Sequence, residues 1–464
     1  MKVDVLVVGS GIAGLCAAIA AKEAGAASIL VVDAAPAPGG TTSMSAGIFV
    51  GAPTRYQRAA GIEDSADSLY RDYMNLSQWG VAAGLVKRFA LESGPTLDWL
   101  GDLGVSFIRQ VFVAGGEDTP RCIAAIGRGK ALIDTLVGAA TDLGIQFMFG
   151  SRIVRLVVES GTVVGAASGD EEFRAPAVIL ATGGIGADSA LLDEWFPSSS
   201  AAGDWRWYAG SLYSRGDAVS LSEEVGAFIA GRDRGLRLLH PRFVDRIESY
   251  HPGWLVFVDR SGRRVVDETG AEGMLDRAAR YAGGVFWAIF DRAALDPETS
   301  RATPGYRVQV PELGERQSAN WNSEMIGAMV NNGRVVSADT VEELAERLSI
   351  DAKQLTATIE RYNAAAGSET DEMGKEVAFI RPVASPPFHG AEIRLASVVV
   401  TATGPGINRQ AEVVDSLGKT IPGLYAAGEA AGGLVGTMYF TGGTALSCGA
   451  VFGRIAGHNA AARR

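Results

Sequence analysis

A glycine-rich turn near the N-terminus has the residue types and spacing that bind a dinucleotide. Residues 3–8 (VDVLVV) form an apolar run that predicts a buried strand, and Gly9, Gly11 and Gly14 follow it as GxGxxG. Gly9 allows the tight turn, Gly11 lets the backbone approach a diphosphate, and Gly14 lets helix and strand pack closely. The pattern therefore predicts a phosphate-binding turn between a strand and a helix.

A second strand and an acidic residue complete a βαβ unit. Residues 28–36 (SILVVDAAP) contain Asp33, about 20 residues beyond the glycines, where a carboxylate can accept hydrogen bonds from ribose hydroxyls. The first turn of the intervening helix, with Ile12 and Ala13, offers unpaired N–H groups and a partial positive charge to the diphosphate. We expect these residues and Ala34 to bind the cofactor.

Composition and charge limit the class of protein. The chain has 464 residues, of which 47% are hydrophobic and 20% charged, and this describes a globular protein with two or three cores. The net charge of −11 argues against nucleic acid as a partner, because phosphate binding needs a basic surface.

The cysteines and the apolar runs exclude further classes. Cys16, Cys122 and Cys448 are far apart and form no CxxC, which excludes a disulfide framework, a zinc ribbon and an attached haem of the CxxCH type. We predict no metal site. The chain begins with a strand rather than a signal peptide and has no run of about 18 apolar residues, so we expect a cytoplasmic protein without a membrane span.

The pattern of predicted elements divides the chain into three parts. Residues 1–231 alternate strands and helices, as a Rossmann-like domain does. Residues 232–350 read as an inserted domain that contains a hairpin with its turn at Ser261-Gly262. Residues 351–464 return to glycine-rich strand–turn–helix patterns. We therefore predict an α/β fold with an inserted α+β domain.

Several motifs, spread over almost the whole chain, resemble the flavoprotein family of fumarate reductases and 3-ketosteroid Δ1-dehydrogenases. The motifs are VVGSGIAG (7–14), GGTTSMSAGIFVG (39–51), ILATGG (179–184), VDRSGRRVVDE (258–268), ADTVEELAERL (338–348) with RYN (361–363), and IPGLYAAGEAAGG (421–433). The resemblance implies an FAD-binding domain of the GR2 type, formed by residues 1–231 and 351–464. It also implies a capping domain for the substrate, residues 232–350.

The resemblance implies which residues hold FAD. Glu429 would bind the ribityl hydroxyls, and the N–H groups that open the last helix would face flavin N1 and O2, where they stabilise negative charge. The other implied contacts are Gly40, Thr41, Thr42, Ser45, Ala46, Gly47, Val154, Ala181, Thr182, Gly183, Gly428, Gly443, Thr444, Ala445 and Leu446. Some family members attach the flavin to a His in the 40s, where this chain has Ser43 and Met44. We therefore predict noncovalent FAD.

The C-terminal stretch resembles the ketosteroid dehydrogenases in its spacing. Tyr439 and Gly443 match the Tyr and Gly that bind the substrate ketone oxygen in that branch, although Phe440 replaces the family's Pro. The resemblance implies that two fixed donors stabilise an enolate while a hydride leaves the β carbon for flavin N5. The other interpretation of Tyr439 is an aromatic residue that only packs.

Two residues of the inserted domain are further catalytic candidates. Glu272 stands where the family has its general-base Tyr, and a Glu can serve as base if burial raises its pKa. The alternative is a solvated loop residue. His240, followed by Pro241, resembles the substrate-binding His of the reductases, and its alternative is a structural role.

The arginines that bind dicarboxylates in fumarate reductases are missing. VGTMYFTGG (435–443) replaces an Arg-containing motif, and Glu272 occupies the position of the proposed proton-donating Arg. We therefore expect an FAD-dependent dehydrogenase of a cyclic ketone that passes its electrons to an external acceptor.

Two alternatives stay open at this stage. One is an ene-reductase or a carboxylate dehydrogenase similar to tricarballylate dehydrogenases, with Arg394 or Arg409 as the carboxylate clamp. The other is an electron-transfer flavoprotein subunit that needs partner chains.

Overall fold

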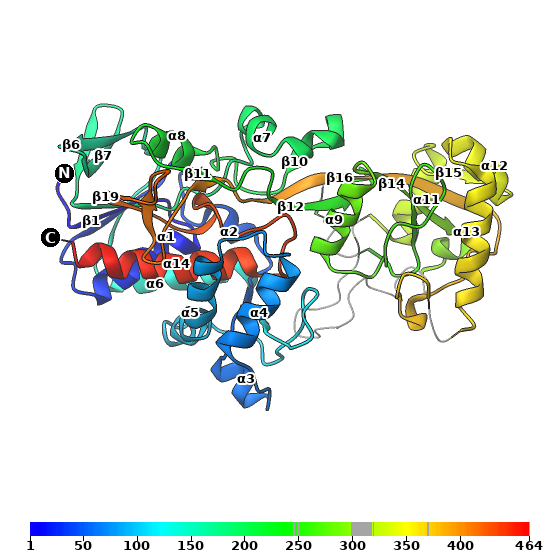
Figure 1. Cartoon of the computed structure of the whole chain (residues 1–464), viewed down its shortest axis with the longest axis horizontal. Coiled ribbons are helices and arrows are strands. Elements are labelled where there is room, and N and C mark those ends of the chain that lie inside the picture. The colour runs from blue at the N-terminus through cyan, green and yellow to red at the C-terminus, as the bar shows by residue number, and fades with distance from the viewer. Residues whose placement is uncertain (245, 248–250, 298–317, 319, 369–370, 464) are drawn as a thin grey trace. The chain divides into compact units, whose positions relative to one another are not determined.

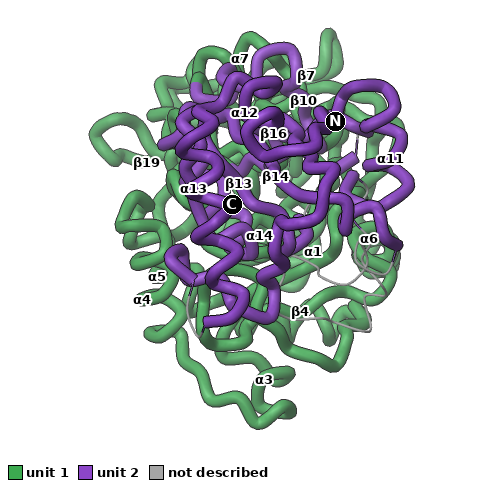
Figure 2. The backbone as a smooth tube through the Cα atoms, turned by 90° about the vertical axis from the view of Figure 1, so that its right-hand side faces the viewer, with its two compact units in different colours: residues 1–197, 210–235, 399–464 green, residues 198–209, 236–398 purple. Residues whose placement is uncertain are grey.

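The chain forms two compact units. The computed structural model describes residues 1–244, 246–247, 251–297, 318, 320–368 and 371–463. Unit 1 comprises Met1–Pro197, Gly210–Gly235 and Val399–Arg464, and unit 2 comprises Ser198–Ala209 and Leu236–Val398 (Figure 2).

Unit 1 contains the glycine-rich turn and both ends of the chain (Figure 1). Its helices are α1 (Ile12–Glu23), α2 (Gly40–Met44), α3 (Arg55–Ala59), α4 (Ala66–Leu76), α5 (Ala83–Asp102), α6 (Arg128–Asp142), α7 (Ser189–Trp195), α8 (Asp217–Glu223) and α14 (Thr444–Ala461). Its strands are β1 (Val5–Val8), β2 (Ile29–Val32), β3 (Ile48–Val50), β4 (Cys122–Ala124), β5 (Gln146–Met148), β6 (Arg155–Glu159), β7 (Thr162–Ser168), β8 (Glu171–Arg174), β9 (Ala177–Leu180), β11 (Ile229–Ala230), β17 (Gly404–Pro405), β18 (Glu412–Val414) and β19 (Thr420–Ala426).

A mostly parallel sheet is the centre of unit 1. Its strand order is β18-β19-β9-β1-β2-β5, and β18 alone is paired antiparallel. The strands VLVV, ILVV and AVIL are apolar and buried throughout, as expected for a parallel sheet covered on both faces. A smaller sheet, β6-β7-β8, contacts β9 and β19. The parallel sheet with its packed helices confirms the predicted α/β fold class.

Helices α1 and α14 pack on each other almost backbone to backbone (Figure 1). A Cβ at Gly453 would lie 2.3 Å from the carbonyl oxygen of Ala13, and one at Gly457 would lie 2.0 Å from that of Ala17. Because residue numbers rise together along the contact, the helices are parallel and their N-termini point the same way. In this register Thr444, the first residue of α14, lies about eight residues before Ile12, the first residue of α1, so α14 begins about 12 Å before α1.

Unit 2 is built on a second sheet with helices on both faces. The strands β13 (Val256–Val258) and β14 (Val285–Asp291) alternate their side chains between two cores, as the two-residue period of a strand requires. One core includes Phe257 and Phe286, and the other includes Val256 and Trp287. The remaining elements of unit 2 are β10 (Trp207–Tyr208), β12 (Gly235–His240), α9 (Glu272–Tyr281), α11 (Ser323–Asn331), β15 (Val336–Ala338), α12 (Val341–Leu348), α13 (Ala352–Ala365) and β16 (Phe388–Thr401).

The bounds of unit 2 differ from those predicted for the inserted domain. The predicted segment, 232–350, falls almost wholly within unit 2, but unit 2 continues to Val398. The continuation has a physical reason, because α13 packs into the core with Trp287 and the first part of β16 pairs with β14 and β15. Residues 198–209 also join unit 2, through the pairing of β10 with β16.

None of the helices in the described part of the chain combines the length and apolar character that crossing a membrane requires.

The α1–α14 contact gives a prediction about stability. Gly453→Ala places a methyl group 2.3 Å from a backbone oxygen, so the helices must separate, and we expect a loss of about 1–3 kcal/mol. Gly138→Ala is the matched control. Gly138 lies inside α6 with nothing within 4 Å of its Cβ position, so that variant should gain about 0.5–1 kcal/mol. Thermal and denaturant unfolding would measure both. Equal stability of the two variants would contradict the contact.

Candidate functional site

Predicted cofactor residues gather at one edge of the central sheet of unit 1. Because β1, β2, β9 and β19 are parallel, their carboxyl ends lie at the same edge, and ligands of open α/β sheets bind outside these ends. The residues that follow these strands are Gly9, Gly11, Ile12, Ala13 and Gly14 after β1, Asp33 and Ala34 after β2, Ala181, Thr182 and Gly183 after β9, and Gly428 and Glu429 after β19.

The three glycines of the glycine-rich turn differ in the space around them. Gly9 has φ +109°, and a Cβ there would lie 2.2 Å from the carbonyl oxygen of Ala181. A Cβ at Gly14 would lie 1.9 Å from the Gly9 oxygen. At Gly11 the nearest atom is 3.4 Å away, the Oγ1 of Thr42. Gly9 and Gly14 thus allow close packing, whereas Gly11 leaves the helix N-terminus open.

The first turn of α1 keeps free donors for a phosphate. Ile12 N–H donates to Thr42 Oγ1 at 3.1 Å, so the protein itself uses this predicted donor. For the N–H groups of Ala13 and Gly14, the described residues provide no acceptor. A bound diphosphate would accept from these two donors at the positive end of the helix.

The carboxylate of Asp33 is held in place beside this turn. Oδ2 accepts from the Ser10 N–H at 2.7 Å and from the Ser10 hydroxyl at 2.5 Å, and Oδ1 accepts from the Ala35 N–H at 2.8 Å. Ala34 lies between them and is half-buried. A carboxylate fixed by donors from both strands can still accept from ribose hydroxyls with its remaining lone pairs.

The loop of residues 39–47 uses several of its predicted polar groups internally. Thr41 Oγ1 accepts from the Ser211 N–H at 3.0 Å. Ser45 Oγ donates to the Thr42 oxygen at 2.7 Å and accepts from the Gly47 N–H at 3.2 Å. This bonding leaves Ala46 exposed at the tip of the turn that follows α2, which begins at Gly40. These bonds give the loop a fixed shape, and its contacts to a cofactor stay a prediction.

Two buried polar side chains mark the ends of β9 and β19. Thr182 Oγ1 is buried without a partner among the described residues, an arrangement that a hydrogen-bonding ligand would relieve. Glu429 Oε1 accepts from the N–H and the hydroxyl of Thr401, both at 2.7 Å, and burial raises the pKa of Glu429. Free helix donors, open space at Gly11 and the orphaned hydroxyl of Thr182 together fit a dinucleotide such as FAD.

The backbone of Val154 bonds to β7 and not to the groups described above. Its N–H donates to the Ala167 oxygen at 2.9 Å, and its side chain is 54% exposed. Its predicted cofactor contact stays a prediction.

The N-terminus of α14 is capped by the predicted substrate-binding Tyr. Ala445 N–H donates to Tyr439 Oη at 2.8 Å, and Tyr439 is buried. Thr444 turns back to the Thr441 oxygen through both its N–H and its Oγ1. Among described residues, neither the Gly443 N–H nor the Leu446 N–H has an acceptor. The hydroxyl of Tyr439 thus takes one of the donors that the sequence assigned to the flavin, and Gly443 and Leu446 keep theirs.

An aromatic pair fixes the turn that carries Tyr439. Tyr73 of α4 donates its hydroxyl to the Leu434 oxygen at 2.7 Å, and its ring stacks on Phe440 with centroids 4.4 Å apart. Phe440, which stands where the ketosteroid dehydrogenases have Pro, therefore orders the turn by stacking.

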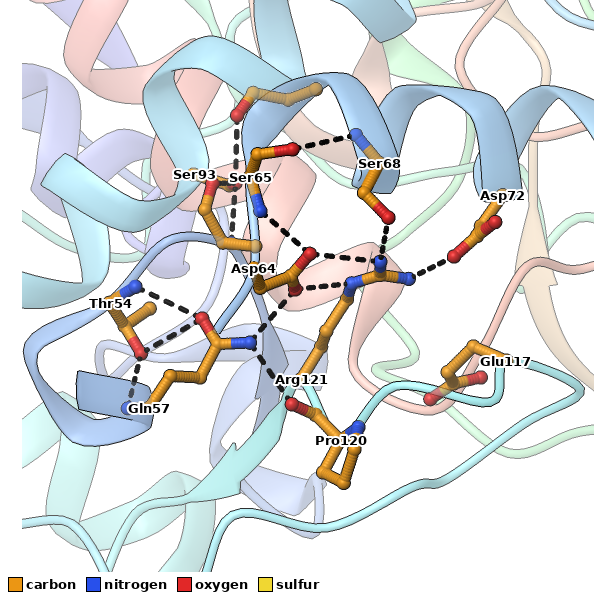
Figure 3. Close-up of polar contacts among 12 residues, drawn as sticks. Thr54, Gln57, Asp64, Ser65, Ser68, Asp72, Ser93, Glu117, Pro120 and Arg121 are labelled. Carbon is orange, nitrogen blue, oxygen red and sulfur yellow. Dashed lines mark hydrogen bonds and ion pairs between the residues drawn. The ribbon is translucent and has the colours of Figure 1, made fainter. Parts of the chain in front are cut away.

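A buried arginine anchors the loop that faces this turn (Figure 3). Arg121 Nε donates to Asp64 at 2.6 Å, Nη1 donates to Asp72 at 2.5 Å and Nη2 donates to Ser68 at 3.0 Å. Two carboxylates thus compensate one buried guanidinium, which is the condition for burying a charge. The anchored loop carries Glu117, which accepts from Thr441.

His240 is used by its own loop. Its Nδ1 accepts from the Arg242 N–H at 2.9 Å, and its Nε2 lies 2.9 Å from the Arg246 oxygen. Because a carbonyl only accepts, Nε2 carries the proton and the ring is neutral. Both nitrogens are therefore engaged by backbone, and the structure favours the structural alternative for His240 over substrate binding.

Glu272 lies at the start of a helix in unit 2. It is the first residue of α9 and is half-buried. The chain just before it is fixed by buried Glu268, which accepts from Arg264 at 2.8 Å and from Lys375 at 3.1 Å. Burial alone would raise the pKa of Glu268, but Lys375 and Arg264 lower it. The segment before α9 is thus held by a buried ion network that the sequence did not reveal.

Sequence reasoning missed several residues of this site. Thr401, Tyr73, Glu117 and Arg121 contact segments that are far away along the chain, and none lies in a recognisable motif. A buried Arg after a Pro, and a Glu beside the exposed Asp118, look like ordinary loop residues. Among the described residues there is no grouping of His, Cys, Asp and Glu that could hold a metal.

Comparisons with known proteins are consistent with this geometry. Residues 4–446 match the family described as "FAD binding domain". A probable fumarate reductase of Shewanella frigidimarina is 30% identical over 481 residues, covering 99% of this chain and 74% of the relative. The NADH:fumarate oxidoreductase of Klebsiella pneumoniae is also 30% identical over 99% of this chain, which spans only 48% of that relative.

A solved structure is similar over nearly the whole of both chains. It is the 3-ketosteroid-Δ4-(5α)-dehydrogenase of Rhodococcus jostii RHA1 with 4-androstene-3,17-dione, with a TM-score of 0.80 and 25% identity. The match covers 99% of this chain and 97% of that chain. The chain is therefore similar both to reductases and to a ketosteroid dehydrogenase, and the comparisons do not separate the two branches.

The loop of residues 39–47 predicts how the cofactor is attached. It contains no His, and its exposed Met44 is no nucleophile for a flavin. Acid precipitation should therefore leave a colourless pellet and release the FAD into the supernatant, where absorbance measures it. Yellow colour that stays with the precipitated protein would mean a covalent link.

Proposed function

Because this chain belongs to the FAD binding domain family and is an FAD-dependent oxidoreductase acting on carbon–carbon bonds, we propose that it dehydrogenates a cyclic ketone. The product carries a C=C bond α,β to the carbonyl. The observation that carries the proposal is the hydroxyl of Tyr439, which is fixed at the N-terminus of α14 beside Gly443.

The proposed role of Tyr439 follows from its hydrogen bond. Its oxygen accepts from the Ala445 N–H, and a hydroxyl that accepts a hydrogen bond becomes a stronger donor. The Gly443 N–H is a second donor, since the described residues give it no acceptor. Removal of the α proton builds negative charge on the ketone oxygen, and two fixed donors stabilise that charge.

The reaction balances with one base and one hydride acceptor. The α carbon gives its proton to a base, for which Glu272 stays the candidate from the sequence, and the β carbon gives up a hydride. Bound FAD supplies the two-electron acceptor, and an external acceptor then takes the electrons.

Charge at the proposed substrate contact favours a neutral substrate. Residues 435–446 (VGTMYFTGGTAL) contain no Lys, Arg or His, so this segment offers no cation to a carboxylate. The relative from Rhodococcus jostii has a steroid dione bound, which is a neutral cyclic ketone.

Tyr439→Phe tests the proposal. Saturated cyclic ketones, from single rings to steroids, are mixed anaerobically with the FAD-loaded protein, and bleaching of the flavin band is followed. At least one ketone should bleach the wild type, and the variant should react about 100- to 1,000-fold more slowly at unchanged FAD content.

The control is Tyr281→Phe, which removes the same hydroxyl from a Tyr that is 79% exposed, and it should react like the wild type. If no ketone bleaches the wild type, or if Tyr439→Phe reacts normally, the ketone assignment is wrong.

Reduction of an α,β-unsaturated carboxylate is a second candidate. The curated relatives include fumarate reductases, and unit 2 has a guanidinium suited to an anion. Arg334 lies 4.3 Å from the ring centre of Trp205 and has no carboxylate partner among the described residues. Burial and the neighbouring Arg242 and Arg394 lower the pKa of Arg334.

The sequence offered different arginines for this role. Arg394 already donates to Glu392 at 2.5 Å and to the Ala202 oxygen at 3.1 Å, and Arg409 is exposed in unit 1. Arg334 is therefore the better candidate for a carboxylate clamp.

Reduced viologen with fumarate, acrylate and larger enoates tests the second candidate. If an enoate is reduced, Arg334→Gln should raise its KM about 10- to 100-fold, because a charge-assisted hydrogen bond is lost. Arg347→Gln is the control, since that exposed Arg of α12 bonds to its near neighbours Glu343 and the Ser337 oxygen. Absence of viologen oxidation with all enoates would remove this candidate.

A further inference from the structure

Glu117 is a buried carboxyl group that the proposed reaction does not use. It is 4% exposed and lies in the loop before β4. Its Oε1 accepts from the Thr441 hydroxyl at 2.8 Å and from the Ala114 N–H at 3.2 Å, and it faces the Cys122 thiol at 3.6 Å. One oxygen thus joins three segments of unit 1, including the turn between Tyr439 and Gly443.

The other carboxyl oxygen of Glu117 is buried without a partner among the described residues. A carboxylate oxygen without a donor is costly in this environment, and burial raises the pKa of Glu117. The donors converge on Oε1, so the proton belongs on Oε2. Burial raises the pKa of Glu117 although the hydrogen bonds from Thr441 and Ala114 lower it, so the group keeps its proton to a higher pH than an ordinary carboxyl does.

The groups around Glu117 do not compensate a negative charge. Arg121, four residues away, is committed to Asp64 and Asp72, and the structure has no ion pair between a described cation and Glu117. Cys122 faces it from β4, and burial raises the pKa of that thiol well above its ordinary value. The turn of residues 439–443 brings Tyr439 as its only titratable side chain.

Close packing shows that the contact between loop and turn is specific. Gly115 pairs with Thr441 as an isolated β-bridge. A Cβ at Gly115 would lie 2.5 Å from Thr441 Oγ1 and 2.6 Å from Glu117 Oε2. The loop also cannot drift, because Arg121 and the bond from Gln57 to the Pro120 oxygen, at 3.0 Å, hold it to the rest of unit 1 (Figure 3).

We propose that Glu117 is a positioning residue that holds Thr441 and thereby keeps Tyr439 and Gly443 in place to bind the substrate oxygen. The inference rests on the proposed function for its catalytic meaning, but the positioning itself does not. Ionisation would leave a buried oxygen with charge and no donor, so the loop would have to open to water. The site would then lose its order as the pH rises.

Two variants separate the neutral acid from the carboxylate. Glu117→Gln keeps an acceptor oxygen at Oε1 and a donor in place of the protonated Oε2, whereas Glu117→Ala leaves Thr441 and Ala114 without their acceptor. Asp118→Asn, at the exposed neighbouring position, controls for the change of charge. The FAD-loaded protein is used throughout.

Hydrogen-exchange protection of residues 435–446, corrected for the intrinsic effect of pH, is the readout that needs no substrate. In the wild type, protection should fall as the pH rises through the raised pKa of Glu117. Glu117→Gln should match the wild type at low pH and keep its protection at high pH, and Asp118→Asn should follow the wild type. Glu117→Ala should be unprotected throughout and should lose about 10- to 100-fold in the rate of flavin bleaching by the ketone.

The pH dependence of the melting temperature is a second test, and the raised pKa fixes its direction. A group whose pKa is raised by folding stabilises the protein while it is protonated. This contribution is lost as the pH rises from the ordinary pKa of the group through its raised pKa in the folded protein. The melting temperature of Glu117→Gln should therefore increasingly exceed that of the wild type with rising pH.

The protection and bleaching results together separate the positioning role of Glu117 from the ketone assignment. A wild type and a Glu117→Gln variant with the same pH dependence of protection would overturn the positioning role, even if Glu117→Ala fails to fold. If the protection data follow expectation but no ketone bleaches the flavin, the positioning role stands and the ketone assignment falls.

Discussion

The contact between α1 and α14 is the constraint on which the site of unit 1 depends. Gly453 and Gly457 bring the backbone of one helix against Ala13 and Ala17 of the other, at distances that no side chain would allow. The parallel arrangement presents two helix N-termini on the same side, offset by about 12 Å along the helix axes. One N-terminus follows the glycine-rich turn and the other carries Tyr439, so a single packing contact sets the spacing between the predicted phosphate-binding turn and the proposed substrate contact.

The sequence predicted what depends on local pattern. The strand before Gly9, the glycine spacing and Asp33 all lie within one βαβ unit, where order along the chain dictates order in space. It could not predict which hydroxyls compete for the helix donors. Thr42 takes the N–H of Ile12 and Tyr439 takes that of Ala445, because both hydroxyls reach the helix ends only after the chain has folded.

The C-terminal bound of unit 2 could not be predicted from the sequence for a related reason. β16 is one continuous strand, yet its membership is set by β14 and β15, which pair with its first part. A strand carries no mark of its partners in its own sequence. Glu117 was equally hidden, since nothing but burial distinguishes it from Asp118.

Charge balance at the turn of residues 439–443 supports the proposed reaction, in which a substrate oxygen becomes negative. The donors at the turn are the Gly443 N–H, the hydroxyl of Tyr439 and the helix end behind them, and all are neutral. Arg121 is the nearby buried cation, but Asp64 and Asp72 compensate it. A cation would bind an anionic substrate before the reaction as strongly as during it, which does not accelerate the chemical step. Fixed neutral dipoles gain most when charge develops on the bound oxygen, so they favour a ketone that passes through an enolate over a carboxylate that is charged from the start.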